Sequence, residues 1–234
     1  SSAKPFQYFF AFVILYRTNA QSRAFEEALI ARQIPYVIYG GLSFYQRREI
    51  KDVLAFLKIV SSGYDLVSFS RTINIPKRGI GKKTIEKLEN IAEDNLISIF
   101  DVCSKITADK SFLKNISIST KAVESIKEYV QIIQHLRSLV IDKIKLHEVL
   151  KVLVEKIGYF SYLKQDPQSF EDRKENIDSL IAKASFWEEK VENPTLINFL
   201  EELALVTNTD DDQNTQKITL MTIHNGKGLE FDSV

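Results

Sequence analysis

An apolar run near the start of the chain decides the first layer of the fold: Phe9-Phe10-Ala11-Phe12-Val13-Ile14-Leu15-Tyr16. The run is short and rich in aromatic and β-branched residues, which is typical of a strand buried on both faces. A second strand is predicted at residues 36–39, between the helix-breaking Pro35 and the turn at Gly40.

A helix is predicted between these two strands. Ser22 is a possible N-cap, and Phe25, Ala28 and Leu29 form one apolar face. Strand, helix and strand in this order make half of an α/β layer. Near the other end of the chain, residues 217–223 alternate with period two and predict a third strand.

The long middle of the chain follows a helical period instead. Apolar residues recur there at spacings of three and four in six segments. These residues are Ile50, Val53, Leu54, Leu57 and Val60; Ile85, Leu88, Ile91 and Ala92; Val123, Ile126, Val130 and Ile133; Val149, Leu150, Leu153 and Ile157; Ile177, Leu180, Ile181 and Ala184; and Leu196, Phe199, Leu200 and Leu203. Pro194-Thr195 is the expected entry to the last of these helices.

We therefore expect a mainly α protein, in which a large all-helical domain is inserted into a small, incomplete α/β layer. Residues 1–41 form the first part of that layer and residues 42–207 the helical domain. Residues 208–234 form a polar, acidic linker and the return to the layer. A layer of two or three strands is hard to stabilise alone.

The composition is that of an ordinary globular protein of 234 residues, with 44% hydrophobic and 26% charged residues. The formal net charge is zero, so nucleic-acid binding would depend on a local basic patch. The single cysteine, Cys103, excludes an internal disulfide, and its apolar context favours a buried side chain over a nucleophile. This is consistent with a reducing, cytoplasmic location. No apolar run approaches the roughly 20 residues that span a bilayer.

Polar residues with binding chemistry follow the first strand. Arg17 and Asn19 stand at its carboxyl end, where α/β folds place ligands. Arginine offers a planar fork to phosphate, and asparagine offers a donor and an acceptor to a base or to the backbone. The simpler interpretation is an ordinary strand-to-helix turn with a surface arginine.

A basic island surrounds the sequence Pro76-Lys77-Arg78-Gly79-Ile80-Gly81-Lys82-Lys83-Thr84. Residues 71–87 hold six basic residues and one acid, Glu86, in a chain that is neutral overall. Glycines let backbone N–H groups approach a phosphate, and a helix N-terminus adds favourable partial charge. Ile80 is expected to anchor the turn in the core. The pattern indicates sequence-independent binding to the DNA backbone, and the alternative is a solvated basic turn that caps a helix.

The third strand ends in the sequence Thr222-Ile223-His224-Asn225-Gly226-Lys227-Gly228-Leu229-Glu230-Phe231. His224 can donate to a phosphate, and Glu230 can accept from a ribose hydroxyl. A single histidine at a strand end is more often structural than catalytic. The three histidines and one cysteine do not cluster, so no metal site is expected. The phosphate-binding pattern Gly-x-x-x-x-Gly-Lys-Ser/Thr is absent from the sequence.

These segments resemble, in order, the motifs of the UvrD/PcrA/Rep-type superfamily-one DNA helicases. The segment around Arg17 resembles motif IVa, and residues 40–52 resemble the next block of the family. Residues 78–81 resemble the Gly-Ile-Gly motif of domain 2B, and residues 222–231 resemble motif V. The resemblance spans essentially the whole chain. It implies a RecA-like domain 2A in the α/β layer and domain 2B in the helical part.

The family consists of DNA-stimulated ATPases that move 3′-to-5′ along single strands and unwind duplexes. The resemblance implies that Arg17, Asn19 and His224 contact single-stranded DNA and that Glu230 reaches the ribose of ATP. It also implies that the basic turn grips duplex DNA ahead of the junction. The residues expected to contact DNA there are Arg78, Gly79, Ile80, Gly81, Lys82 and Thr84. DNA is the expected partner, no membrane is expected, and DNA repair or replication is the expected setting.

The resemblance also implies what the chain alone lacks. The phosphate-binding loop and metal-binding acids of the family would precede residue 1, and a second arginine-bearing motif would follow residue 234. ATP and Mg²⁺ are therefore expected cofactors of a full-length parent, an ATP hydrolase. The chain alone is expected to hold no catalytic residue and no cofactor and to be inactive.

Two residues depart from the family's pattern. Gly226 stands where alanine or serine is usual, and Lys58 stands where arginine is common. Two other classes remain open. One is a helicase–nuclease subunit, which usually lacks this basic hairpin, and the other is a non-catalytic DNA- or protein-binding module. A phosphate-binding loop upstream would separate the helicase from the module.

Overall fold

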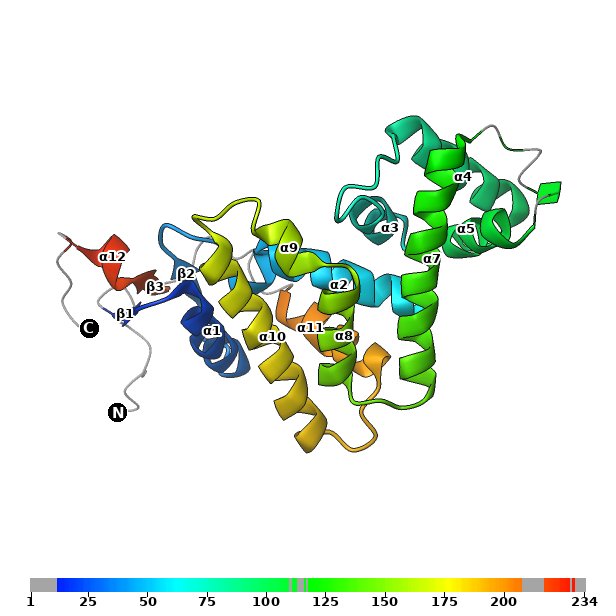
Figure 1. Ribbon diagram of the computed structural model, residues 1–234. Helices are drawn as coiled ribbons and strands as arrows, with labels where there is room; N and C mark the ends of the chain where they lie inside the picture. The colour runs from blue at the N-terminus through cyan, green and yellow to red at the C-terminus, as the bar shows by residue number, and fades with distance from the viewer. Residues whose placement is uncertain are drawn as a thin grey trace. The chain divides into compact units, whose positions relative to one another are not determined.

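The computed structural model describes residues 12–109, 111–112, 116, 118–207, 217–227 and 229 (Figure 1). The chain divides into two compact units. The first comprises Ser1–Ile50, Glu171–Leu180 and Glu201–Val234, and the second comprises Lys51–Phe170 and Ile181–Leu200. Part of the first predicted strand, residues 9–11, and residues 208–216, which include nearly all of the predicted acidic linker, lie outside the described residues. The domain boundaries predicted at residues 42 and 207 stay a prediction.

The first unit contains a three-stranded parallel sheet. Strands β1 (Val13–Tyr16), β3 (Ile218–Thr222) and β2 (Tyr36–Ile38) lie in this order. The strand that comes last in the sequence therefore lies between the first two. Tyr16 pairs with Thr222, and Ile38 pairs with Leu220. Because the strands are parallel, all three carboxyl ends lie at one edge of the sheet.

Helix α1 (Ser22–Ala31) connects β1 to β2 and follows a short 3-10 helix, η2 (Asn19–Gln21). The predicted apolar face is wrong in part, since Phe25 is 37% exposed and Ala28 is also exposed. The N-cap is Gln21 instead of the predicted Ser22. The buried side chains of the helix are those of Ser22, Glu26 and Leu29. A buried carboxylate needs hydrogen-bond partners, and this need decides which face of the helix turns inward.

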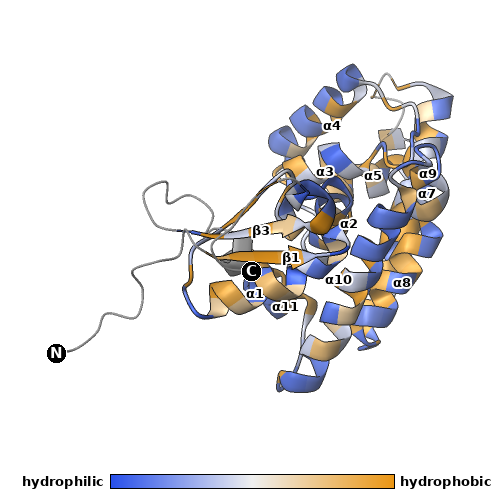
Figure 2. Cartoon of the chain, turned by 90° about the vertical axis from the view of Figure 1, so that its left-hand side faces the viewer, coloured by the Kyte–Doolittle hydropathy of each residue, from blue (hydrophilic) through white to orange (hydrophobic). Residues whose placement is uncertain are grey.

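The core of the first unit is small. Tyr16, Leu29 and Leu220 are buried together, and partly buried hydrophobic side chains pack around them. Those side chains belong to Ile14, Ile34, Tyr36, Ile38 and Ile218. Figure 2 shows β1 as a strongly hydrophobic segment, as expected for a strand covered by other elements.

The middle of the chain folds into helices, as predicted. The described helices are α2 (Arg48–Ser61), α3 (Leu66–Thr72), α4 (Lys82–Asn95), α5 (Ile99–Ala108), α7 (Thr120–Ile141), α8 (Leu146–Lys156), α9 (Tyr159–Leu163), α10 (Phe170–Lys190) and α11 (Leu196–Thr207). A 3-10 turn, η3 (Phe44–Gln46), precedes α2, and the short α12 (Ile223–Gly226) follows β3. The mainly α fold with a small parallel α/β layer is confirmed.

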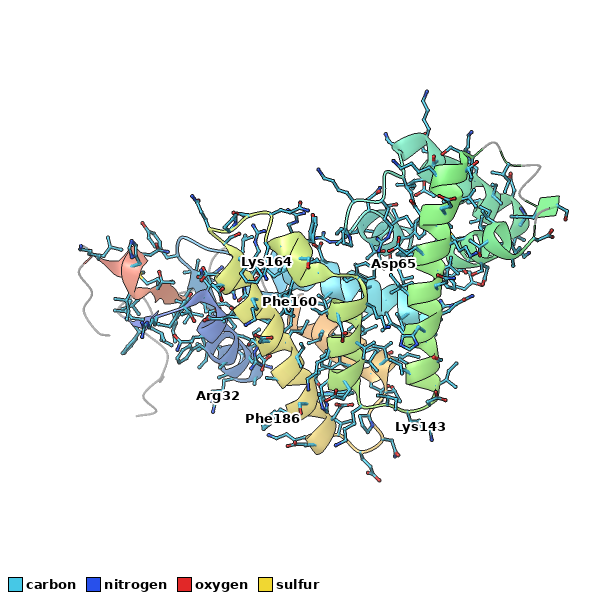
Figure 3. The ribbon with its side chains drawn as sticks, in the orientation of Figure 1. Arg32, Asp65, Lys143, Phe160, Lys164 and Phe186 are labelled. Atoms are coloured by element: carbon cyan, nitrogen blue, oxygen red, sulfur yellow. The ribbon has the colours of Figure 1, made fainter. Side chains whose placement is uncertain are left out.

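Three helices, α3, α5 and α9, were not among the periodic segments of the sequence, and two of them are short, with seven residues in α3 and five in α9. Side-chain caps begin two of them. Asp65 Oδ1 accepts from Ser68 N at 2.9 Å at the start of α3 (Figure 3), and Ser98 Oγ accepts from Asp101 N at 3.0 Å at the start of α5. The predicted entry to α11 is confirmed, since Thr195 Oγ1 accepts from Asn198 N at 3.2 Å.

In the second unit, consecutive helices pack on one another: α4 on α5, α5 on α7, α7 on α8, and α8 on α9. Aromatic side chains are buried in this unit, and the rings of Phe69 and Tyr129 lie perpendicular to each other with 5.9 Å between centroids. Cys103 is fully buried, and burial raises the pKa of its thiol. This confirms the prediction of a small buried side chain.

Candidate nucleic-acid interface

The carboxyl edge of the parallel sheet brings two predicted DNA contacts to one place. Arg17 directly follows β1, and His224 stands two residues after the end of β3. Because Tyr16 pairs with Thr222, the chain leaves both strands at the same level. Both residues are exposed. The edge therefore offers a guanidinium and an imidazole to solvent, and both groups can donate to a phosphate.

The turn after β1 is ordered by the side chain of Gln21. Its Oε1 accepts from Arg17 N at 2.9 Å and from Thr18 N at 3.2 Å. Asn19 Nδ2 lies 3.5 Å from Asp172 Oδ2, near the start of α10. These contacts fix the backbone of the turn. Among the described residues, no hydrogen bond or ion pair engages the guanidinium of Arg17.

Asn225 belongs to this edge, although the sequence motifs gave it no role. Its Nδ2 lies 3.4 Å from Tyr39 O and 3.5 Å from Gly40 O, so it joins the ends of β3 and β2. Thr222 Oγ1 accepts from Asn225 N at 3.2 Å and caps α12. A threonine three residues before this asparagine, near the end of an alternating segment, is the capping signal that indicates such a turn.

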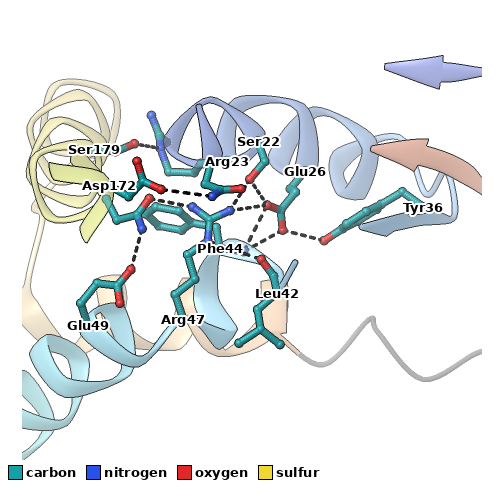
Figure 4. A network of polar contacts seen from close by, with 12 residues as sticks. Ser22, Arg23, Glu26, Tyr36, Leu42, Phe44, Arg47, Glu49, Asp172 and Ser179 are labelled. Carbon is teal, nitrogen blue, oxygen red and sulfur yellow. Dashed lines mark hydrogen bonds and ion pairs between the residues drawn. The ribbon is translucent and has the colours of Figure 1, made fainter. Parts of the chain in front are cut away.

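A buried polar network in the first unit is centred on Arg47 (Figure 4). Arg47 Nη1 donates to Asn176 Oδ1 at 2.7 Å, and Nη2 donates to Ser22 Oγ at 2.6 Å. The guanidinium carbon lies 5.3 Å from the centroid of the Phe44 ring. Burial lowers the pKa of Arg47. The arginine thus ties the start of α1 to residues that are distant in the sequence.

Glu26 is the buried carboxylate of the same network. It accepts from Ser22 Oγ at 2.6 Å, from Phe44 N at 3.0 Å and from Tyr36 OH at 3.2 Å. Arg47 Nη2 lies 4.0 Å from its Oε1. Burial raises the pKa of Glu26, while these hydrogen bonds and the charge of Arg47 oppose that shift. Arg47 belongs to the motif at residues 40–52. In the fold, this arginine binds buried polar groups of α1 and α10.

The basic turn between α3 and α4 alternates between inward and outward residues. Arg78 and Ile80 are 9% and 3% exposed, whereas Gly79 and Gly81 are exposed. The prediction that Ile80 anchors the turn is therefore correct. The side chain of Asn74 holds it in place: Nδ2 donates to Ile80 O at 2.7 Å, and Ile80 N donates to Asn74 Oδ1 at 3.1 Å.

Arg78 turns inward, whereas the sequence predicted a contact with DNA. Its Nη1 lies 2.8 Å from Ile75 O and 3.3 Å from Ile73 O, and its guanidinium carbon lies 5.6 Å from the centroid of the Tyr129 ring. Within the described chain, its buried Nε has no hydrogen-bond partner. Burial lowers the pKa of Arg78. The guanidinium therefore holds the turn against the carbonyl end of α3, where positive charge is favourable.

Two exposed features remain on the outer side of the turn. Gly79 has a φ of +70°, and a Cβ added there would meet no described atom within 4 Å. Gly81 is the N-cap of α4, and no side chain caps the first N–H groups of this helix. Lys82 is 91% exposed and lies 3.7 Å from Glu86. A phosphate could accept hydrogen bonds from the uncapped N–H groups and interact with the exposed lysines, and the glycines leave the backbone accessible to it.

One of the two departures from the family's pattern, Gly226, has a local explanation. A Cβ on Gly226 would lie 3.2 Å from Leu15 Cδ2 and 3.4 Å from Met221 Sδ, so the glycine allows α12 to lie close to the sheet. Lys58 Nζ lies 4.0 Å from Asp65 Oδ2.

Glu230, the predicted ATP contact, lies outside the described residues. Within the described ranges, no group of three or more His, Cys, Asp or Glu residues is arranged to hold a metal ion. In the same part of the chain, no helix combines the length and the apolar character needed to cross a membrane.

Comparison with known proteins places this geometry in a family. The UvrD-like helicase C-terminal domain matches residues 7–234. The ATP-dependent DNA helicase PcrA of Staphylococcus aureus strain Mu50 is 39% identical over 226 residues, which cover 94% of this chain and 30% of the relative. PcrA of Staphylococcus epidermidis strain ATCC 12228 is 38% identical over 225 residues, with the same coverage. The chain thus spans about 30% of the length of these relatives. The chain belongs to the UvrD-like helicase C-terminal domain family.

Proposed function

We propose that this chain is the part of an ATP-dependent 3′-to-5′ DNA helicase that contacts both the single strand and the duplex ahead of the junction. Membership of the helicase family supports this proposal, and so do relatives that are named ATP-dependent DNA helicases. The observation that carries it is the outer side of the basic turn. Exposed glycine backbone and an uncapped helix N-terminus meet there with exposed lysines in a chain of zero net charge.

The duplex is gripped through its phosphates. The N–H groups at the start of α4 and the backbone at Gly79 and Gly81 approach phosphate oxygens, and Lys82 and Lys83 add charge. Thr84 follows them in the first turn of α4. Ile80 and Arg78 do not touch DNA in this proposal. They hold the turn in shape from the inside.

The single strand passes along the carboxyl edge of the sheet. Arg17 and His224 donate to its phosphates, and Asn19 contacts a base or the backbone. The Arg47–Glu26 network fixes the start of α1 and thereby the turn that carries Arg17 and Asn19. Arg47 and Glu26 are therefore positioning residues for the single-strand contact.

In the whole protein, residues 1–41 and 208–234 contribute to domain 2A and residues 42–207 form domain 2B. Glu230 reaches the ribose of ATP, and the Mg²⁺-dependent chemistry depends on groups outside these 234 residues. The chain by itself binds DNA and does not hydrolyse ATP.

Salt-dependent binding to a labelled hairpin duplex with a single-stranded tail tests the duplex contact. Lys82→Ala and Lys83→Ala are each expected to flatten the plot of log affinity against log salt by about 0.9, one phosphate contact each. Sequence preference should not change, because phosphate contacts carry no base information. Arg17→Ala and His224→Ala should instead weaken binding to the single strand and leave the hairpin stem contact intact.

Lys151→Ala and Lys156→Ala are matched controls, because both lysines are exposed on α8 in the same unit as the turn. If these controls change the salt dependence as much as the turn variants do, the turn is not the duplex site.

A further inference from the structure

Two uncharged polar side chains, those of Asn74 and Ser125, hold the exposed backbone of the basic turn from its inner side. Ser125 lies on α7, and its Oγ donates to Arg78 O at 3.0 Å. Asn74 lies just after α3 and contacts Ile80 twice, through Nδ2 to Ile80 O at 2.7 Å and through Oδ1 to Ile80 N at 3.1 Å. All of these residues belong to the second unit.

Helix α7 is itself fastened to the segment that leads into the turn. Tyr129 OH and Thr72 Oγ1 lie 2.8 Å apart, and both residues are buried. The Tyr129 ring also lies 5.6 Å from the guanidinium carbon of Arg78. Ser125 stands four residues before Tyr129, so the two side chains share one face of α7. The Ser125 hydroxyl is therefore held at the turn by a buried contact.

The contact at Arg78 O sets the direction of the next N–H group. The peptide bond between Arg78 and Gly79 is trans. A trans peptide is planar, so its C=O and N–H groups point in opposite directions. Because Arg78 O faces Ser125 on α7, the N–H group of Gly79 points away from α7.

The N–H group of Gly81 is oriented in the same way by Asn74. The peptide bond between Ile80 and Gly81 is also trans. Because Ile80 O faces Asn74, the N–H group of Gly81 points away from Asn74. Both glycines are exposed, and neither N–H group donates to another atom of the described chain. The turn thus presents two free donors whose directions are fixed by other side chains.

We infer, on the basis of the duplex contact proposed above, that Ser125 and Asn74 are positioning residues for that contact. They hold the N–H groups of Gly79 and Gly81 toward an incoming phosphate. Donors whose directions are set in advance favour binding, because the turn then loses less conformational freedom when the phosphate arrives. The alternative is that the two side chains stabilise the fold and have no effect on the DNA contact.

Glycine amide signals in NMR spectra separate the two cases. The chain has eight glycines, so labelling with ¹⁵N-glycine gives few signals. The whole 234-residue chain is titrated with the hairpin duplex. In the unchanged chain, the signals of Gly79 and Gly81 should shift. The signal of Gly158, whose N–H group donates to Glu155 O at 2.9 Å, should stay in place.

Each variant should change the response of its own glycine. Ser125→Ala should reduce the shift of Gly79 more than that of Gly81, and Asn74→Ala should do the reverse. Ser125→Ala should also weaken hairpin binding by about fivefold, the effect of one lost hydrogen bond. The slope of log affinity against log salt should not change, because no cation is removed. Ser125→Thr keeps the hydroxyl and should restore both the shift and the affinity.

Ser138→Ala and Asn95→Ala are the matched controls. Ser138 is exposed on the same helix and donates to His135 O at 2.7 Å. Asn95 is exposed at the end of α4 and donates to Ile91 O at 2.8 Å. Both controls should bind the hairpin within about twofold of the unchanged chain. Circular dichroism at the temperature of the titration verifies that each variant is folded.

The duplex contact and the positioning role fail in different ways. If neither Gly79 nor Gly81 of the unchanged chain responds to the duplex, the turn is not the duplex site and both ideas are wrong. If both respond, but folded Ser125→Ala and Asn74→Ala respond and bind like the unchanged chain, only the positioning role is wrong, even where the melting temperature falls. If Asn74→Ala does not fold, Ser125→Ala decides alone, since it deletes one hydroxyl from a half-buried side chain.

Discussion

Arg47 and Arg78 are both buried, and each guanidinium group is stabilised by different partners. Burial lowers the pKa of both side chains. Arg47 shares its donors between Asn176 and Ser22 near the carboxylate of Glu26, whereas Arg78 relies on backbone carbonyls and the face of Tyr129. A guanidinium is weakly hydrated and presents five donors in a rigid fork, so it tolerates such sites better than an ammonium group does.

The contacts of Arg78 make its effect on stability predictable. Arg78→Met should destabilise the fold by about 2–3 kcal/mol, since carbonyls at the end of α3 lose a charged donor. Arg78→Lys should recover only part of this, because one ammonium group cannot reproduce the fork. Urea unfolding followed by circular dichroism gives the change. Lys77→Met, at the exposed neighbour, should stay within about 0.5 kcal/mol. An unchanged midpoint for Arg78→Met would show that the guanidinium does not hold the turn.

These residues also mark what sequence patterns could predict at this scale. The charge count of residues 71–87 located the basic island, but a count does not say which cation faces the core. Apolar spacing predicted that Phe25 lies on the buried face of α1. This was wrong, because the spacing takes no account of a polar network between residues such as Arg47 and Asn176 that lie far apart in the chain. The partners of buried polar groups are known only from the tertiary structure, and here they determine which face of α1 is buried.

At the scale of elements, the strongly periodic helices and the three strands were predictable because period alone distinguishes them. The order β1-β3-β2 was not, since strand order depends on pairing between segments about 200 residues apart. The turn between α3 and α4 was predictable in its chemistry, with glycines beside lysines, and Ile80 was correctly placed inside. The two glycines of this turn are not equivalent, however, and only their backbone angles separate them.

Gly79 and Gly81 should therefore respond differently to alanine. Gly79 has a φ of +70°, so Gly79→Ala places a Cβ in the left-handed region and should cost about 1–2 kcal/mol. Gly81 has a φ of −74°, and Gly81→Ala should be close to neutral, because a weaker N-cap is offset by lower entropy of the unfolded chain. Thermal melts of the two variants make the comparison. Equal costs would mean that backbone conformation does not distinguish the two positions.

Duplex affinity adds a second comparison for the same pair. Folding of each variant is first verified by circular dichroism at the temperature of the binding experiment. Gly79→Ala should then weaken binding to the hairpin duplex, because the new methyl group stands on the open side of the turn. If folded Gly79→Ala binds as well as the unchanged chain, the phosphate does not approach at Gly79.

At the scale of the whole molecule, the chain has zero net charge but carries a local basic island at residues 71–87. No long-range field draws in DNA, so in the proposed function the affinity for DNA depends on the few phosphates that would meet the turn and the carboxyl edge of the sheet. The fold class followed from the sequence because the α/β segments flank a long helical stretch. The roles of single residues followed less well, because Arg17, Asn225 and His224 acquire their setting only when distant strands pair.

The chain as a whole should bind DNA without hydrolysing ATP. Its 234 residues contain no Gly-x-x-x-x-Gly-Lys-Ser/Thr segment, and in P-loop ATPases the hydrolysis of ATP needs such a cradle with its lysine and bound Mg²⁺. Phosphate release with ATP, Mg²⁺ and saturating single-stranded DNA should therefore equal that of a buffer blank. Binding to the labelled hairpin in the same preparation shows that the chain is folded and occupied, so the absence of turnover cannot be attributed to damaged protein. Trace contamination by another ATPase is recognised because Arg17→Ala would not alter it. Turnover that exceeds the blank and falls with Arg17→Ala would place a complete ATPase site within these residues and contradict the proposal.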